Sequence, residues 1–228
     1  VGSEMCIRDR IYIASSRYSN ITVQDGATFT GNYAWTKGGA ILMQGSYAGS
    51  SSQFLALTRD VLFSGNMTGG TFTRHSDGSF SVENGIANAI HMGGDQNVQL
   101  AASEGRQIRF NDPVTSSALS SSRENIAFSI NQYMDGDNPR TTGGTVIFSG
   151  ELYQGEDSHL VASRYNDFKG QTTLYGGTLV LEHNVVFGNS DLREDTSMTL
   201  ENGTLEITGG STVNAASFTV SHADIVLR

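Results

Sequence analysis

The feature that most constrains the fold is the spacing of the apolar residues, which stand two apart in short runs. Met198 and Leu200 form one such pair, and Leu205 and Ile207 form the next. Side chains two residues apart lie on the same side of a β-strand, so each pair indicates a strand with one buried side. The polar segments between the pairs, such as 201–203, are too short to hold a crossover helix. The chain is therefore expected to be all-β, with strands joined by little more than turns.

The composition supports an all-β fold and argues against two classes of binding partner. Glycine, serine, threonine and asparagine together make up 90 of the 228 residues, so residues that favour turns and strands outnumber helix formers. Hydrophobic residues make up 37% of the chain, which is enough for a core. The formal net charge is −9 and no run of Lys or Arg occurs, which argues against nucleic acid and anionic membranes as partners. No stretch reaches the roughly 18 to 20 apolar residues that span a bilayer.

The first ten residues differ in character from the rest of the chain. Val1–Arg10 (VGSEMCIRDR) lacks the apolar segment of a signal peptide and resembles a leader translated from sequencing-adapter DNA. We interpret this segment, 1–10, as non-native and residues 11–228 as the native domain. The only cysteine, Cys6, lies in the leader, so residues 11–228 can form neither a disulfide nor a thiolate metal site.

Two architectures suit many short strands joined by polar turns: an antiparallel sandwich or barrel, and a parallel β-helix. Phe29 and Phe63, in the segments FTGN and FSGN, stand 34 residues apart, and Gly144 and Gly177, in two GGT segments, stand 33 apart. An uneven repeat of this length favours the β-helix, a solenoid in which each rung has to match only its neighbours. Asn-Gly pairs at 84–85 and 202–203 keep hairpins open as an alternative.

Two segments are expected to be exposed loops. The first, near 112–124, contains an Asp112-Pro113 step and a serine-rich run over Ser116–Ser122. The second, near 135–142, has the sequence DGDNPRTT. Between them, the alternation in NIAFSIN predicts a strand over 125–131.

Paired tetrapeptides recur in the N-terminal half. Phe29–Asn32 (FTGN) is followed by Gly38–Ile41 (GGAI), and Phe63–Asn66 (FSGN) is followed by Gly69–Phe72 (GGTF). The first pair resembles the FxxN and GGA(I/L/V) motifs of polymorphic outer-membrane proteins, a branch of the autotransporters, whereas GGTF only approximates the second motif. Further on, two segments resemble other parts of autotransporter passengers: 105–114 (GRQIRFNDPV) the rung before a loop, and 166–181 (NDFKGQTTLYGGTLVL) the autotransporter-associated strand repeat.

The resemblance implies a right-handed parallel β-helix passenger that a C-terminal translocator barrel carries to the cell surface, where it stays or is secreted. The sequence contains neither that barrel nor a signal, so we interpret residues 11–228 as an internal fragment. Asparagine at a corner tolerates the left-handed conformation and bonds its own backbone. We therefore predict that Asn32 and Asn66 occupy bends and stack on each other, with Phe29 and Phe63 inside.

No set of residues indicates a catalytic site, a cofactor or a metal. Cleavage of sugars needs paired carboxylates on a groove, but the candidate groups lie in turn-like polar segments: Asp135 with Asp137, Glu156 with Asp157, and Asp191 with Glu194 and Asp195. No HxxxH pair and no GxSxG elbow occurs, and the histidines are scattered: His75, His91, His159, His183 and His222. Tyr33 and Trp35 flank the first GGAI segment and either cap a rung or form exposed aromatics for sugar or protein contact.

The expected function is therefore a non-enzymatic structural and adhesive module of the bacterial surface. Its loops, near 112–124 and 135–142, would contact a host-cell surface, a matrix or a glycan, because loops on rigid scaffolds commonly carry binding. The alternative is a carbohydrate-active β-helix enzyme, a polysaccharide lyase or a glycoside hydrolase. A spacer with no partner is the third possibility.

Overall fold

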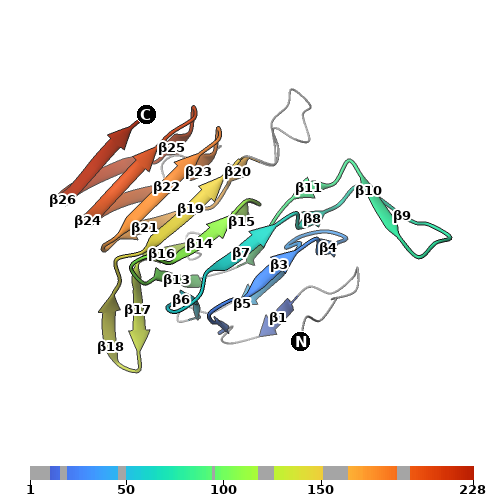
Figure 1. Cartoon of the computed structure of the whole chain (residues 1–228), viewed down its shortest axis with the longest axis horizontal. Coiled ribbons are helices and arrows are strands. Elements are labelled where there is room, and N and C mark those ends of the chain that lie inside the picture. Colours follow the sequence, from blue (N-terminus) through green and yellow to red (C-terminus); the bar gives the residue numbers. More distant parts are fainter. Residues whose placement is uncertain are drawn as a thin grey trace.

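The computed structural model describes residues 11–15, 20–45, 50–93, 96–117, 126–150, 164–188 and 196–228. In these ranges all regular secondary structure consists of β-strands, and no helix is present. The strands follow one another around a coil that ascends from β1 to β26 (Figure 1). Strands of successive rungs pair in parallel, as β1 with β5 and β7 with β14 do. The predicted parallel β-helix is confirmed, and the antiparallel sandwich is not formed.

Three faces, each made of parallel strands, enclose the core. Face 1 contains β2 (Thr22–Val23), β6 (Ser51–Ala56), β13 (Gln96–Ala102), β16 (Ile126–Ile130) and β21 (Gly170–Leu174). Face 2 contains β3 (Thr28–Thr30), β7 (Val61–Ser64), β14 (Gln107–Phe110), β19 (Thr145–Ser149) and β22 (Thr178–Glu182). The long strands β24 (Thr196–Ile207) and β26 (Ser217–Leu227) run through both faces. Face 3 contains β1 (Ile11–Ser15), β5 (Ile41–Gly45), β12 (Ile90–Gly93) and β15 (Val114–Ser116), followed by β20 (Tyr165–Asn166), β23 (Val186–Gly188) and β25 (Thr212–Asn214).

The core is built from side chains of like shape stacked between rungs. On face 2, the rings of Phe29, Phe63, Phe110 and Phe148 stack with centroid separations of 4.6, 4.8 and 5.0 Å. This spacing follows from the distance of about 4.8 Å between paired strands. Phe63 is fully buried and Phe29, in the first rung, is partly buried, so both lie inside as predicted.

The corners after Phe29, Phe63 and Phe110 carry a ladder of polar side chains. Asn32 Nδ2 donates to Asn66 Oδ1 at 2.7 Å, and Asn66 Nδ2 donates to Asp112 Oδ2 at 2.6 Å. Both asparagines are buried in bends between strands, which confirms the prediction of stacked corner asparagines. The left-handed conformation falls on the preceding glycines, Gly31 and Gly65, with φ of 64° and 73°. Glycine therefore makes the turn, and asparagine supplies the bonds between rungs.

The GGAI segment packs closely against the next rung. Gly39 N–H donates to the carbonyl of Asn88 at 2.9 Å, and a Cβ on Gly39 would lie 2.5 Å from that oxygen. Ile41 pairs with Ile90 in the second rung. The place of the second GGA(I/L/V) motif is thus taken by residues 87–90, whereas the GGTF segment at 69–72 leads into an insertion.

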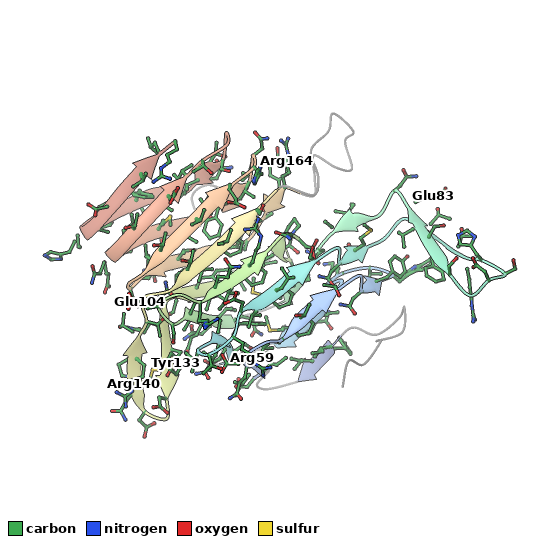
Figure 2. The ribbon with its side chains drawn as sticks, in the orientation of Figure 1. Arg59, Glu83, Glu104, Tyr133, Arg140 and Arg164 are labelled. Atoms are coloured by element: carbon green, nitrogen blue, oxygen red, sulfur yellow. The ribbon has the colours of Figure 1, made fainter. Side chains whose placement is uncertain are left out.

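That insertion is one of two antiparallel hairpins, called arms here, that extend from the coil (Figure 1). The first arm consists of β9 (Thr71–Arg74) and β10 (Phe80–Glu83). The small sheet at its base contains β4 (Tyr33–Ala34), β8 (Met67–Thr68) and β11 (Ile86–Ala87). The second arm consists of β17 (Gln132–Asp135) and β18 (Asn138–Thr141), joined by a two-residue turn. Figure 2 shows Glu83 on the first arm and Tyr133 and Arg140 on the second.

Three local expectations need correction. The segment 135–142 forms most of an arm instead of an irregular loop, because Gly136 takes the left-handed turn position with φ of 60°. Within 112–124, residues 114–116 form β15 and Val114 is buried, while 118–124 lie outside the described residues. Neither Asn-Gly pair makes a hairpin turn: residues 84–85 join β10 to β11, and residues 202–203 form the corner inside β24.

Candidate functional site

Of the candidate carboxylates, the structure describes Asp135 and Asp137, and it places both on the second arm. Asp135 lies at the end of β17, where its Oδ2 is 3.5 Å from Arg140 Nε and both side chains are exposed. Asp137 follows it in the turn of the same arm. The other candidates, 156, 157, 191, 194 and 195, lie outside the described residues. Within the described part of the chain, no group of three or more His, Cys, Asp or Glu side chains is arranged to hold a metal ion.

The histidines fall in different environments. His75 lies on the first arm, with its Nε2 3.1 Å from the exposed Ser81 Oγ. His183 Nε2 is 3.8 Å from Glu182 Oε1, and His222 lies exposed on β26. His91 is buried on face 3, and His159 lies outside the described residues.

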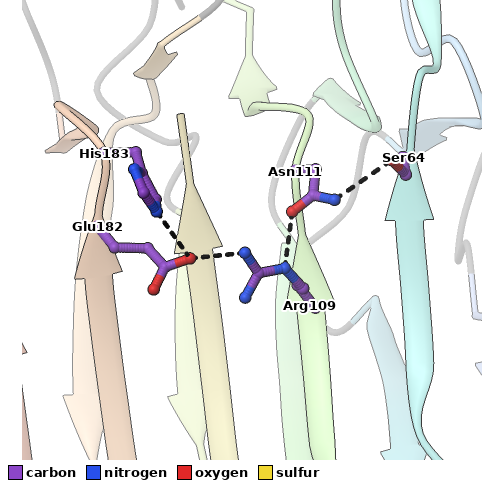
Figure 3. Close-up of polar contacts among 5 residues, drawn as sticks. All are labelled: Ser64, Arg109, Asn111, Glu182 and His183. Carbon is purple, nitrogen blue, oxygen red and sulfur yellow. Dashed lines mark hydrogen bonds and ion pairs between the residues drawn. The ribbon is translucent and has the colours of Figure 1, made fainter. Parts of the chain in front are cut away.

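Face 2 carries a chain of polar contacts between rungs on its outer side (Figure 3). Arg109 Nη2 on β14 lies 2.6 Å from Glu182 Oε1 on β22, and both side chains are 21% exposed. Arg109 Nε also donates to Asn111 Oδ1 at 2.8 Å, and Asn111 Nδ2 donates to Ser64 Oγ at 3.2 Å. The donors and acceptors in this row of contacts pair with one another, mostly across rungs. We therefore interpret the row as contacts that stabilise the pairing of the strands.

A second polar cluster lies on the outer side of face 3, and we call it the His91 cluster. It contains Lys37, Asn88, His91, Thr115 and Ser117. His91 Nδ1 lies 2.8 Å from Thr115 Oγ1, and His91 Nε2 lies 3.0 Å from Ser117 Oγ. Asn88 Nδ2 donates to Thr115 Oγ1 at 2.9 Å, and Lys37 Nζ donates to Ser117 Oγ at 3.2 Å.

Parallel pairing on face 3 assembles this cluster from residues far apart in sequence. His91 on β12 pairs with Thr115 on β15, and Ser117 N–H donates to the carbonyl of Met92 at 2.9 Å. Lys37 approaches from the segment before the GGAI motif and remains exposed. In the sequence, His91 is one of five scattered histidines and Ser117 lies in the serine-rich run over 116–122. These residues come together because β12 pairs with β15. This pairing can be predicted from sequence only when the first and last residues of each rung are known.

Electrostatics fixes the protonation state of the cluster. Burial, and secondarily the charge of Lys37, lower the pKa of His91 to about 4, so its ring is neutral at pH 7. The ammonium of Lys37 beside Ser117 disfavours an N–H on the Nε2 side of the ring. We therefore assign the proton to Nδ1, where it is donated to Thr115, and Nε2 accepts the Ser117 hydroxyl proton.

The aromatic residues beside the GGAI segment separate into one buried and one exposed group. Tyr33 is 5% exposed and its ring stacks on Phe72 of the first arm, with centroids 5.4 Å apart. Trp35 is 72% exposed. Tyr33 therefore supports the base of the arm, and Trp35 is the residue of the two that can contact another molecule.

Comparison with known proteins gives distant relatives. The chain is 30% identical over 198 residues to "Probable outer membrane protein pmp8" of Chlamydia pneumoniae, a match that covers 86% of this chain. It is 30% identical over 199 residues to pmp13 and 31% identical over 188 residues to pmp2, two further probable outer membrane proteins of that organism. The chain is a distant relative of these Chlamydia proteins.

The similarity covers only a segment of each relative, because the chain spans about a fifth of their length, from 18% to 20%. No family model and no solved structure matches the chain. Among the described residues, the structure contains no helix that is long and apolar enough to span a membrane.

Proposed function

We propose that the chain is part of an autotransporter passenger of the bacterial surface, either attached or secreted, and that it acts as an adhesive scaffold whose binding is non-enzymatic. The two arms would contact a host-cell surface, a matrix or a glycan. The names of the relatives support an outer-membrane setting, and the motif resemblance supports a passenger.

The observation that carries the adhesive role is the way in which the first arm is inserted. The insertion interrupts the second rung, yet Ile90 still pairs with Ile41 and Val114 on either side. Most described side chains of the arm between Thr71 and Glu83 are exposed, and the others, Phe72, Ser81 and Val82, are half-buried, so the arm adds little to the core. An isolated two-stranded hairpin is only marginally stable in water. An exposed hairpin that the coil does not need is well suited to contact a partner.

The structure allows each arm to be removed without opening the coil. A Cβ on Gly70 would lie 2.7 Å from the Gly85 nitrogen, so deletion of residues 71–84 joins two points that are already adjacent. The second arm can be shortened by replacing residues 133–140 with Asn-Gly, because Gln132 pairs with Thr141 and this dipeptide makes a two-residue hairpin turn.

The test is binding of the labelled chain to cultured mammalian cells, to immobilised fibronectin and collagen, and to a glycan array. We expect the chain to bind at least one of these surfaces and an arm-deleted variant to lose that binding. Circular dichroism checks that the variants keep the β-helix. Absence of binding on all surfaces would contradict the adhesive role, and binding that survives loss of both arms would contradict their part in it.

A further inference from the structure

The His91 cluster has a geometry that a scaffold does not require. We propose that Ser117 is a nucleophile for short carboxylic esters, with His91 as its general base and Lys37 as the stabiliser of negative charge. This activity is independent of the arms, so its test and the binding test succeed or fail separately.

The first support is the arrangement of nucleophile, base and orienting group. An activated serine needs a base within hydrogen-bond reach, and the base needs a third group that fixes its orientation. Ser117 Oγ lies 3.0 Å from His91 Nε2, and Thr115 Oγ1 lies 2.8 Å from Nδ1. Thr115 is held in turn by Asn88 Nδ2 at 2.9 Å. Because His91 is only 6% exposed, its ring is also held by the surrounding packing.

The second support is the placement of charge. Lys37 Nζ lies 3.2 Å from Ser117 Oγ, where a positive charge favours the alkoxide form of the serine. The same ammonium is within reach of the oxygen that becomes negative when an ester carbonyl is attacked. The tautomer assigned above leaves the lone pair of Nε2 directed at the serine hydroxyl, as a general base requires.

The third support is space beside the hydroxyl. Gly93 lies on β12 between Gln44 and Ser117, and a Cβ placed there would be 3.6 Å from Gln44 Cγ and 3.9 Å from Ser117 Oγ. Gly93 is not among the glycines with positive φ, so its backbone does not demand glycine. The missing side chain leaves room next to the nucleophile for about one methyl group, such as the methyl of an acetyl ester. The alcohol part of the ester, for example an O-acetylated sugar, would lie toward the exposed side chain of Lys37.

The proposed reaction needs no reagent other than the ester and water. Ser117 Oγ bonds to the ester carbonyl carbon while its proton moves to His91 Nε2. The tetrahedral intermediate then expels the alkoxide, which takes the proton from His91 and leaves as the alcohol. Water attacks the acyl-serine with His91 again accepting the proton, and the carboxylic acid is released as Ser117 regains its proton.

The chain contains an internal control for this proposal. His75 Nε2 lies 3.1 Å from Ser81 Oγ on the first arm, a similar contact between the same two residue types. That pair is exposed, whereas the ring of His91 is buried and held by Thr115. If orientation and burial create the nucleophile, Ser117 reacts and Ser81 does not.

The experiment uses a fluorophosphonate probe, which phosphonylates nucleophilic serines with loss of fluoride, and 4-nitrophenyl acetate as a substrate. We expect one label per chain, located by peptide mass spectrometry on Ser117. Ser117→Ala should lose both labelling and esterase activity, and His91→Gln should slow both at least about 100-fold. Ser81→Ala should behave as the wild type. Circular dichroism confirms folding of each variant.

A label on another serine, or a wild-type chain that labels no faster than the same chain in denaturant, would overturn the proposal. Mapping the label on the unmutated chain keeps the test valid even if a variant fails to fold. The pH dependence provides a second readout, since neutral His91 predicts a rate that is nearly constant from pH 9 to pH 5 and falls near its pKa of about 4. A rate that falls near the ordinary histidine pKa of about 6.5 would point to another base.

Discussion

Replacement of Asp112 tests whether the corner ladder holds the first rungs together. Its carboxylate is 1% exposed and accepts three hydrogen bonds. Gly65 N–H and Asn66 N–H each donate at 2.9 Å, and Asn66 Nδ2 donates at 2.6 Å. In Asp112→Ala the two Asn66 donors stay buried and the Gly65 N–H stays partly buried without that acceptor, at a cost of about 1–3 kcal/mol for each buried donor and less for Gly65. Relief from burying a carboxylate offsets part of the cost, so we expect a loss of about 3–5 kcal/mol in the free energy of unfolding.

The matched control is Asn32→Ala at the open end of the same ladder. It removes the side-chain bond to Asn66 Oδ1 and should cost about 1 kcal/mol. Urea unfolding followed by circular dichroism gives both values. Because a solenoid can open rung by rung, amide hydrogen exchange at Gly65 and Asn66 adds a local reading. The reasoning fails if Asp112→Ala loses no more stability than Asn32→Ala, or if the Asn66 amide keeps its protection.

Three further changes probe the core, the corners and the buried histidine. Phe63→Ala should cost about 3–5 kcal/mol and Phe29→Ala about half as much, because the Phe29 ring is only partly buried; equal losses in urea unfolding would contradict the stacking argument. Gly39→Ala places a Cβ 2.5 Å from a backbone oxygen and should lower the melting temperature more than Gly31→Ala, which has open space but a φ of 64°. Burial lowers the pKa of His91 from 6.5 to about 4, so the unfolded chain binds more protons between these values and stability falls as pH falls through them, by up to about 3 kcal/mol. His91→Gln should remove that slope, and an unchanged slope would assign it to other groups.

The sequence predicted the parts of the fold that depend on local repetition. The FxxN segments place Phe29 and Phe63 in the core and Asn32 and Asn66 in bends, because these positions recur in every rung that carries the motif. The predicted strand over 125–131 is β16, Ile126–Ile130, and the alternating side chains of Ile126, Phe128 and Ile130 are buried. Such features can be predicted from the alternation of apolar residues and from the residues that favour turns. The prediction does not require knowing which rungs are neighbours.

The features that sequence analysis missed depend on the register between rungs. The Asp112-Pro113 step predicts the start of a loop, yet Asp112 continues the ladder formed by Asn32 and Asn66. The sequence hides this role because the first arm is inserted between Asn66 and Asp112, so the spacing of the FxxN motifs is lost. The GGTF segment has the composition of a corner but opens an arm. His91, Thr115 and Ser117 come together only when β12 is paired with β15. None of these follows from the period of a single strand.

The coil separates stability from display. Its stability comes from rows that continue from rung to rung, such as the stacked phenylalanines, and each rung depends only on its neighbours. The chain can therefore leave a rung at Gly70 and return at Gly85 while Ile41 and Ile90 remain paired. Sequence inserted at such a point can change without changing the core. The first arm is thus the segment that selection for a new contact can alter at least cost, whereas the His91 cluster is fixed by the register of the coil.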